Sequence, residues 1–254
     1  MIDEWDVEIP TLTGDKKRRA YVYLPVDYEY NEDRYYPVMY MFDGHNLFYD
    51  YYATFGKCWG LKDYLDATQT PLIIAAVECN TEGNNRLSEY SPVDFDFNGE
   101  KIKGRGKKYM DWLVKSFKPY IDANLRTLPD RANTAIGGSS MGGLMTLYAI
   151  SKYNKVFSRG AALSPSLWAN GGEIPEFIKS GKFGKNTILY MDYGSREFIN
   201  HEPQKKVFQA TGAYLFEQGV NLTMRVVPNG THSEASWERQ VPFFMNALGF
   251  EGES

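Results

Sequence analysis

The chain has few of the residues that mark disulfide-rich or metal-binding proteins. Only two of its 254 residues are cysteines, Cys58 and Cys79. Two cysteines are too few for a disulfide framework, and they show no metal-ligand spacing. Both have apolar or aromatic neighbours in the sequence, which favours buried free thiols. Because histidines, cysteines and carboxylates nowhere cluster at metal-ligand spacing, we expect no metal and no cofactor.

Long hydrophobic and long basic runs are also lacking. No apolar run approaches the length needed to cross a bilayer, so we expect no membrane partner. The first ten residues, "MIDEWDVEIP", are acidic and lack the continuous apolar stretch of a secretory signal, which favours a cytoplasmic protein. The basic stretch "GDKKRR" (14–19) is short, and 28 basic against 32 acidic residues give a net charge of −4. Electrostatic binding to nucleic acid is therefore not expected.

What the chain does have is enough apolar surface for one large core. Hydrophobic residues make up 43% and aromatic residues 15% of the 254 positions. We find no internal repeat, low-complexity tract or linker. The sequence therefore predicts a single domain over residues 1–254.

Short β-rich runs alternate with helical patterns along most of the chain. Several of these runs are continuously apolar, as expected for strands covered on both faces. The strand-like runs cover residues 18–25, 35–44, 71–79, 133–138, 158–166, 186–194 and 221–229. The helical patterns cover residues 109–125, 205–219 and 233–250, and Pro119 predicts a kink or break in the first of them. The alternation predicts an α/β fold with a mostly parallel sheet of about eight strands and helices on both faces.

Three further segments complete the expected architecture. Residues 7–12 and 18–25 are close enough in sequence to form an antiparallel hairpin at one edge of the sheet. Residues 80–108 form the longest region without clear periodicity, and a loop that long in a compact domain is usually functional or mobile. Residues 169–185 are too few for a large lid domain.

The stretch "TAIGGSSMGGLMTLYAI" (134–150) holds two adjacent serines among glycines. The pattern G-x-S-x-G fits only when it starts at Gly138, which makes Ser140 the candidate nucleophile and leaves Ser139 pointing elsewhere. A bare match can arise by chance, but this one lies between a predicted strand and a predicted helix, as a nucleophile elbow does. The N-terminus of that helix would favour negative charge on a reacting oxygen.

A serine hydroxyl needs a base, and the chain has three histidines: His45, His201 and His232. In the fold class that has such a nucleophile elbow, the order is nucleophile, acid, histidine, with the histidine after the final strand. His232 follows the last predicted strand and a glycine turn, so it is the candidate base. His201 lies in a polar loop, where a surface role is expected.

The triad acid should follow the strand before that, in "TILYMDYGSRE". Asp192 lies within the apolar strand, whereas Glu197 lies in the loop beyond it, from which a side chain can reach back towards the histidine. We therefore prefer Glu197 as the acid and keep Asp192 as the alternative.

An oxyanion hole needs two main-chain N–H donors. One is expected from Met141, the residue after the nucleophile. The other is expected from His45, in the loop after "PVMYMFDG", which leaves the His45 imidazole free to line the pocket. Asn46, the next residue, is a candidate for substrate binding.

These residues together resemble the esterase family of α/β-hydrolases that includes esterase D, enterochelin-type siderophore esterases and feruloyl esterases. The blocks that carry the resemblance run in the family's order from about residue 36 to residue 237: "YPVMYMFDGHNLF", "NNRLSEYSP", "GGSSMGGL", "ALSPSLW", "YMDYGSRE" and "GTHSEASW". The resemblance implies the α/β-hydrolase fold, Ser140 as nucleophile, Glu197 or Asp192 as acid and His232 as base. Relatives carry an aspartate where this chain has Glu197.

The resemblance also implies roles around the substrate. It places Trp168 of "SPSLW" near the acyl or alcohol pocket. Arg86, in the "R-x-x-E-Y" stretch with Glu89, either forms a local ion pair or contacts substrate, and the ion pair is preferred. The aromatic segment "LFYDYYATF" (47–55) either forms a wall for aromatic or sugar-like groups or packs into the core.

The function that these expectations favour is a serine carboxylesterase. It would act through an acyl-enzyme on a small ester with a sugar-like or aromatic part, such as an acylated sugar or a siderophore. Acyl transfer, or an S-formylglutathione-type thioesterase activity, on the same triad is one alternative. The other is a non-catalytic binding protein of the same fold.

Overall fold

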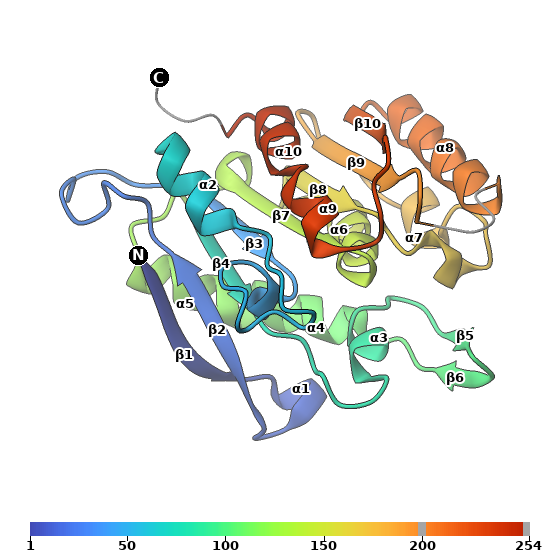
Figure 1. Cartoon of the computed structure of the whole chain (residues 1–254), viewed down its shortest axis with the longest axis horizontal. Helices are drawn as coiled ribbons and strands as arrows, with labels where there is room; N and C mark the ends of the chain where they lie inside the picture. The colour runs from blue at the N-terminus through green and yellow to red at the C-terminus, as the bar shows by residue number, and fades with distance from the viewer. Residues whose placement is uncertain (198–201, 251–254) are drawn as a thin grey trace.

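The computed structural model of the chain describes residues 1–197 and 202–250. An eight-stranded sheet forms its centre, in the order β1-β2-β4-β3-β7-β8-β9-β10 (Figure 1). The strands of this sheet are β1 (Ile2–Glu8), β2 (Lys17–Tyr23), β3 (Val38–Met41), β4 (Ile73–Val77), β7 (Thr134–Ser139), β8 (Arg159–Leu163), β9 (Ile188–Gly194) and β10 (Asn221–Val227). A separate hairpin pairs β5 (Phe95–Phe97) with β6 (Glu100–Ile102).

Six neighbouring strands of the sheet, from β4 to β10, are parallel. Strand β7 lies between β3 and β8, and every residue of β3, β4 and β7 is buried. Continuous burial explains why these strands have continuous rather than alternating apolar runs. The antiparallel strands β1 and β2 complete one edge. The predicted mostly parallel sheet of about eight strands is confirmed.

Helices cover both faces of the sheet (Figure 1). The α-helices are α1 (Pro10–Thr13), α2 (Leu61–Thr68), α3 (Asn85–Glu89), α4 (Gly106–Trp112), α5 (Lys118–Asn124), α6 (Met141–Lys152), α7 (Glu176–Lys179), α8 (Glu202–Glu217), α9 (Glu234–Glu238) and α10 (Val241–Leu248). Short 3-10 turns occur at Gly44–Asn46, Arg131–Asn133 and Leu167–Asn170, and a π-helical turn at Leu113–Phe117. Apolar residues of α2 and α10 pack on one face of the sheet, and those of α4, α5, α6 and α8 on the other.

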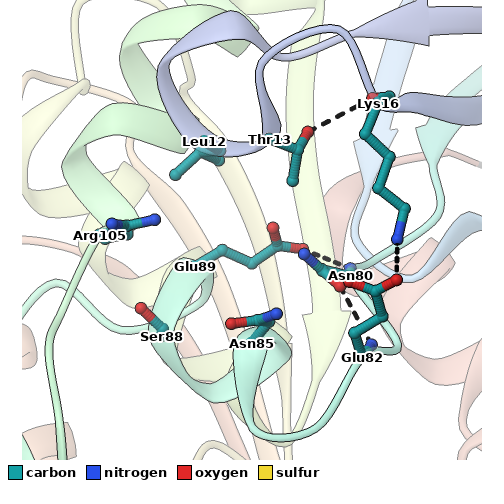
Figure 2. Close-up of a pocket in the computed structure, with 9 residues that line it drawn as sticks. All are labelled: Leu12, Thr13, Lys16, Asn80, Glu82, Asn85, Ser88, Glu89 and Arg105. Carbon is teal, nitrogen blue, oxygen red and sulfur yellow. Dashed lines mark hydrogen bonds and ion pairs between the residues drawn. The ribbon is translucent and has the colours of Figure 1, made fainter.

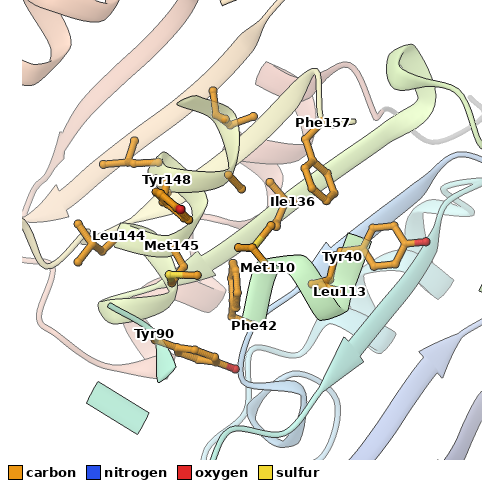
Figure 3. Close-up of a cluster of buried hydrophobic side chains, with 14 of the residues drawn as sticks. Tyr40, Phe42, Tyr90, Met110, Leu113, Ile136, Leu144, Met145, Tyr148 and Phe157 are labelled. Carbon is orange, nitrogen blue, oxygen red and sulfur yellow. The ribbon is translucent and has the colours of Figure 1, made fainter. Parts of the chain in front are cut away.

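The larger core lies between the sheet and the helices α4 to α6. Figure 3 shows Tyr40 and Phe42 from the β3 region facing Met110 and Met145 from the helices. All four side chains are at most 2% exposed. This packing fixes the position of α6, the helix that follows the candidate nucleophile.

The N-terminal hairpin differs in one respect from the sequence-based expectation. Its antiparallel pairing is confirmed, since Val7 pairs with Arg18. The first strand, however, spans Ile2–Glu8, so the expected strand at residues 7–12 was wrong at both ends and shares only Val7 and Glu8 with it. Pro10 has no N–H for a strand ladder and suits a first helical turn, and Pro10–Thr13 form α1.

Two proline-containing helical segments are interrupted in different ways. The segment predicted at 109–125 is helical from Gly106 to Asn124, and the turn before Pro119 widens to a π-helix. The widening accommodates a residue that cannot donate a main-chain hydrogen bond. The segment predicted at 233–250 starts after Ser233 as expected but divides into α9 and α10, with Pro242 in the first turn of α10.

The region 80–108 contains more structure than its sequence indicates. It holds the short helix α3 and the β5–β6 hairpin. Within the described part of the chain, no helix is both long and apolar enough to cross a membrane.

Candidate active site

Ser140 occupies the sharp turn between β7 and α6, at the carboxyl edge of the parallel strands. Its backbone has φ 58° and ψ −120°, a conformation that non-glycine residues rarely adopt and that stores strain. The Ser140 N–H donates to Leu163 O at 2.9 Å, and its carbonyl accepts from Ser166 N at 3.0 Å. Ser139 is 5% exposed at the end of β7. The turn therefore buries Ser139 and leaves Ser140 partly exposed.

The glycines beside Ser140 allow this turn to approach the end of β3. A Cβ added to Gly138 or to Gly142 would lie 3.0 Å from Phe42 Cβ, closer than ordinary van der Waals contact. A second atom of the Phe42 side chain would lie 3.0 Å from the Cβ at Gly138 and 3.6 Å from the Cβ at Gly142. The spacing of glycines around Ser140 thus has a packing reason as well as a conformational one.

His232 and Glu197 meet at the same edge of the sheet. His232 Nδ1 lies 3.0 Å from Glu197 Oε2, with side chains 37% and 1% exposed, respectively. Glu197 Oε1 accepts hydrogen bonds of 2.5 Å from Gly194 N and from Ser164 Oγ. The carboxylate is therefore held from three sides, and one of its oxygens faces the imidazole.

Two glycines bring the acid loop and the histidine loop together. A Cβ on Gly194 would lie 2.4 Å from Gly230 C, so only glycine permits this contact. Arg196 N donates to Gly230 O at 2.8 Å, and Asn229 N donates to Ser195 Oγ at 2.9 Å. These contacts fix the loop after β9 against the loop after β10, from which Glu197 and His232 project.

Ser164 and Trp237 support the pair, and the sequence analysis gave neither a role. Ser164 Oγ accepts a 2.9 Å hydrogen bond from Trp237 Nε1 while it donates to Glu197. The Trp237 ring packs edge-on against the His232 ring, with centroids 5.1 Å apart. Ser164 has φ 45°, another strained position. Both residues lie in blocks that carry the family resemblance, which was the signal available.

Asp192, the alternative acid, lies in β9 and contacts other groups. It is 1% exposed, accepts from Tyr190 OH at 2.7 Å and accepts from Ser164 N at 3.2 Å. Burial raises the pKa of Asp192 to about 7, because the two hydrogen bonds only partly offset the loss of hydration. His232 Nδ1 contacts Glu197 and not Asp192.

The Ser140 hydroxyl has a different neighbour from the one expected of a triad serine. Its Oγ lies 3.3 Å from Ser166 Oγ. Within residues 1–197 and 202–250, it makes no hydrogen bond to His232. In the absence of substrate, catalytic hydrogen bonds are often long and tighten only when the complex forms. Ser166 is 1% exposed, so its hydroxyl has little contact with solvent.

The two main-chain donors expected of an oxyanion hole are both at this edge. Met141 is the first residue of α6, and His45 lies in the 3-10 turn Gly44–Asn46 after β3. Among the described residues, neither main-chain N–H donates a hydrogen bond. Unpaired N–H groups at a helix start and a tight turn are what a developing negative oxygen requires.

Asp43, at the start of the same turn, pairs with Arg86 of α3. Arg86 Nε and Nη2 each donate a 2.7 Å hydrogen bond to one Asp43 oxygen, and Asp43 is 4% exposed. Burial alone would raise the pKa of Asp43, but the Arg86 charge and hydrogen bonds hold it below its usual range. Asp43 has φ 56°. Arg86 does form an ion pair, but the expected local pair with Glu89 was wrong, because its partner Asp43 lies 43 positions earlier in the chain.

Glu89, the last residue of α3, forms a second buried ion pair. It forms two hydrogen bonds with Arg18, of 3.1 and 2.7 Å, and both side chains are at most 3% exposed. Glu89 lines a pocket of about 250 Å³, and the lining also includes Lys16 and Glu82, which form an ion pair (Figure 2). None of the candidate catalytic residues lines this pocket. The two ion pairs together fix α3 between the sheet edge and the turn after β3.

Asn46 and Trp168, the other candidates for substrate contact, each have protein partners. Asn46 Oδ1 accepts from Thr54 N at 2.9 Å, which braces the following loop. Trp168 is partly exposed and packs against Phe95 and Phe97 of the β5–β6 hairpin, with ring centroids 5.7 and 5.8 Å away. Trp168 lies two residues after Ser166, so the aromatic group stands close to the nucleophile turn.

The aromatic segment 47–55 packs into the core in part, as one of its two expected roles requires. Leu47 and Phe48 are buried in the core, whereas Tyr51 and Phe55 are 73% and 80% exposed.

His201 lies outside the described residues. The side chains of Asp43, His45 and Cys79 form a buried group of metal-ligand types.

Comparisons with known proteins agree with this architecture. The model of an esterase family, described as "Putative esterase", matches residues 12–246. The "Uncharacterized protein YbbA" of Bacillus subtilis is 27% identical over 183 residues, which cover 71% of this chain and 69% of YbbA. An "Endo-1,4-beta-xylanase/feruloyl esterase" of Xylanibacter ruminicola is 28% identical over 231 residues, 88% of this chain but only 28% of that longer protein.

A solved structure shares the fold at lower sequence identity. The enterobactin esterase FES of Shigella flexneri superposes with a TM-score of 0.71 and 18% identity, covering 98% of this chain and 58% of FES. At this identity the likeness establishes the fold and no more. With the family match over nearly the whole length, it leads to one conclusion: the chain belongs to the esterase family and has the α/β-hydrolase fold.

Proposed function

We propose that the chain is a serine carboxylesterase in which Ser140 is the nucleophile, His232 the base and Glu197 the acid. The observation that carries the proposal is the 3.0 Å contact between His232 Nδ1 and Glu197 Oε2. Because Glu197 is itself held by two 2.5 Å hydrogen bonds, it keeps Nδ1 protonated and leaves Nε2 free to accept a proton. Asp192 is directed at Tyr190 and Ser164 instead.

The reaction follows from these positions. Ser140 Oγ attacks the ester carbonyl carbon while its proton passes to His232 Nε2, and the main-chain N–H groups of Met141 and His45 stabilise the oxyanion. Collapse of the tetrahedral intermediate expels the alcohol, which takes the proton from His232. Water then attacks the acyl-enzyme by the same path and releases the acid.

The substrate we propose is a small ester with an aromatic or sugar-like part. The partly exposed Trp168, with Phe95 and Phe97 behind it, offers an aromatic surface near the nucleophile turn. The names of the relatives point the same way, since one is a feruloyl esterase and another an enterobactin esterase. Acyl transfer to an alcohol on the same machinery would appear as an ester product when alcohols are added.

The test is hydrolysis of a panel of p-nitrophenyl esters of increasing acyl size by the wild type, Ser140→Ala and Ser139→Ala. We expect Ser140→Ala to lose activity by about 10³-fold or more. Ser139→Ala, the matched control, should retain most of it. Full activity in Ser140→Ala would remove Ser140 from the mechanism. No activity in a folded wild type that also fails to react with a serine-directed phosphonate would favour the binding-protein alternative.

A further inference from the structure

Three buried side chains meet behind the turn that holds the proposed oxyanion donor. The ligand-type atoms of Asp43, His45 and Cys79 all lie within 4.8 Å of one another. The three residues are 4%, 8% and 4% exposed. Asp43 and His45 follow β3 and Cys79 follows β4, and these parallel neighbours end at the same edge. Because Cys79 is distant in sequence, linear spacing did not reveal this group.

One nitrogen of the His45 ring is available to a ligand. Its Nε2 lies 3.0 Å from Thr54 Oγ1, whereas its Nδ1 is buried and has no hydrogen-bond partner among the described residues. With the proton on Nε2 donated to Thr54, Nδ1 presents a free lone pair. A metal-ligating histidine typically has its second nitrogen satisfied in this way.

We propose that Asp43, His45 and Cys79 bind one divalent cation of the zinc class. Imidazole, thiolate and carboxylate together suit Zn²⁺ or Co²⁺, and three protein ligands leave the fourth tetrahedral position to water. Mg²⁺ and Ca²⁺ prefer oxygen ligands and do not fit this set. Each Asp43 oxygen accepts one hydrogen bond from Arg86, and the Cys79 thiol also bonds to this carboxylate. Once the thiol has lost its proton, a lone pair of Asp43 is left for the metal.

Binding of the divalent cation releases a proton from the site, which offsets part of the added positive charge. The Cys79 thiol gives its proton to solvent as its sulfur coordinates the cation, so affinity rises with pH. Tetrahedral coordination spaces the ligand atoms at about 3.5 Å. Coordination draws in any ligand atom that stands farther out, up to the 4.8 Å limit, and we expect this to shift the turn that carries His45. If His45 N–H is an oxyanion donor, which rests on the proposed function, the bound metal lowers the esterase rate.

The test uses Co²⁺, whose thiolate complexes have a charge-transfer band in the near ultraviolet. The Cys58→Ser variant is the central sample, because Cys79 is then the sole thiol in the chain. We expect it and the wild type to show the band with one equivalent of Co²⁺. Cys79→Ser and His45→Gln should weaken binding by about 100-fold or more, since loss of a ligand costs at least as much as loss of an outer-shell partner.

His232→Gln separates this site from the catalytic pair, which could itself attract a cation. We expect His232→Gln to keep the band and the stoichiometry. Absence of the band in folded Cys58→Ser, or loss of it in His232→Gln, would overturn the proposal. These readouts are spectroscopic, so they do not depend on whether the esterase assignment holds. Added Zn²⁺ should also lower the wild-type kcat several-fold without affecting Cys79→Ser.

Discussion

The Ser164 hydroxyl donates a 2.5 Å hydrogen bond to Glu197 Oε1. It can do so because Trp237 Nε1 occupies its acceptor side at 2.9 Å, which orients the hydroxyl proton towards the carboxylate. Trp237 also packs against the His232 ring. A single chain of contacts therefore positions both the proposed acid and the proposed base.

Ser164→Ala should lower kcat about 10-fold with little change in KM. A hydrogen bond to a charged group is worth about 1.5–3 kcal/mol, and its loss lets the Glu197 carboxylate turn away from His232. Steady-state kinetics on the best p-nitrophenyl ester measure the change. Trp237→Phe should give a smaller loss, because it removes the Nε1 donor that orients the Ser164 hydroxyl but leaves the hydroxyl able to bond Glu197. An unchanged kcat in Ser164→Ala would mean that the Ser164 hydroxyl does not position Glu197.

Glu197→Gln should lower kcat by about 10²- to 10⁴-fold, because an amide cannot stabilise the imidazolium that forms in the transition state. Asp192→Asn should stay within a few-fold of the wild type, since Asp192 does not contact His232. The comparison of kcat in the two variants decides between the two carboxylates. A larger loss in Asp192→Asn, in protein shown to be folded by circular dichroism, would reverse the acid assignment.

Asp192 should instead affect the pH dependence of stability. Burial raises its pKa to about 7 in the folded chain, against a reference value of 3.8, so the folded state favours the protonated form. Above pH 3.8 this carboxyl ionises more readily in the unfolded chain than in the folded chain. The free energy of unfolding therefore falls as the pH rises, until the pH passes about 7. The pKa of this carboxyl is also affected by three neighbouring groups, Tyr190, Glu197 and Arg225.

Asp192→Asn therefore gains stability relative to the wild type as the pH rises from 5 to 8. We expect a relative gain of about 2 kcal/mol in the free energy of unfolding, which is less than the raised pKa alone would give over this pH range. Urea denaturation of both proteins at each pH measures it, and the difference between them removes contributions from other groups. A difference that stays constant over this range would show that Asp192 is not the titrating group.

The sequence predicted the elements whose pattern is local. The strand, glycine turn and helix around Ser140 were identified because all three signals lie within seventeen adjacent residues. Glu197 was preferred over Asp192 because a loop after a strand can reach back, and the 3.0 Å contact with His232 agrees with that reasoning.

What the sequence could not predict depends on residues far apart in the chain. The Arg86–Asp43 pair joins α3 to the turn after β3, and nothing in the local pattern favoured Asp43 over Glu89 as the partner. The strands of the small β5–β6 hairpin have three residues each, too few for a periodic signal, and only Phe95 and Ile102 of the six residues are buried. Its aromatic residues are ordered by Trp168, which lies far along the chain.

Arg86→Met should destabilise the fold by about 3 kcal/mol, because it leaves the Asp43 carboxylate buried without a counter-charge. The double variant Asp43→Asn with Arg86→Met should recover at least half of that loss. Asparagine suits this comparison, since it keeps the shape of aspartate and tolerates the positive φ of position 43. Urea denaturation at pH 7 supplies the free energies for the cycle of four proteins. If the double variant is no more stable than Arg86→Met, the loss comes from the packing of Arg86 on Tyr90, where the guanidinium lies 5.4 Å from the ring centroid, and not from the unpaired charge.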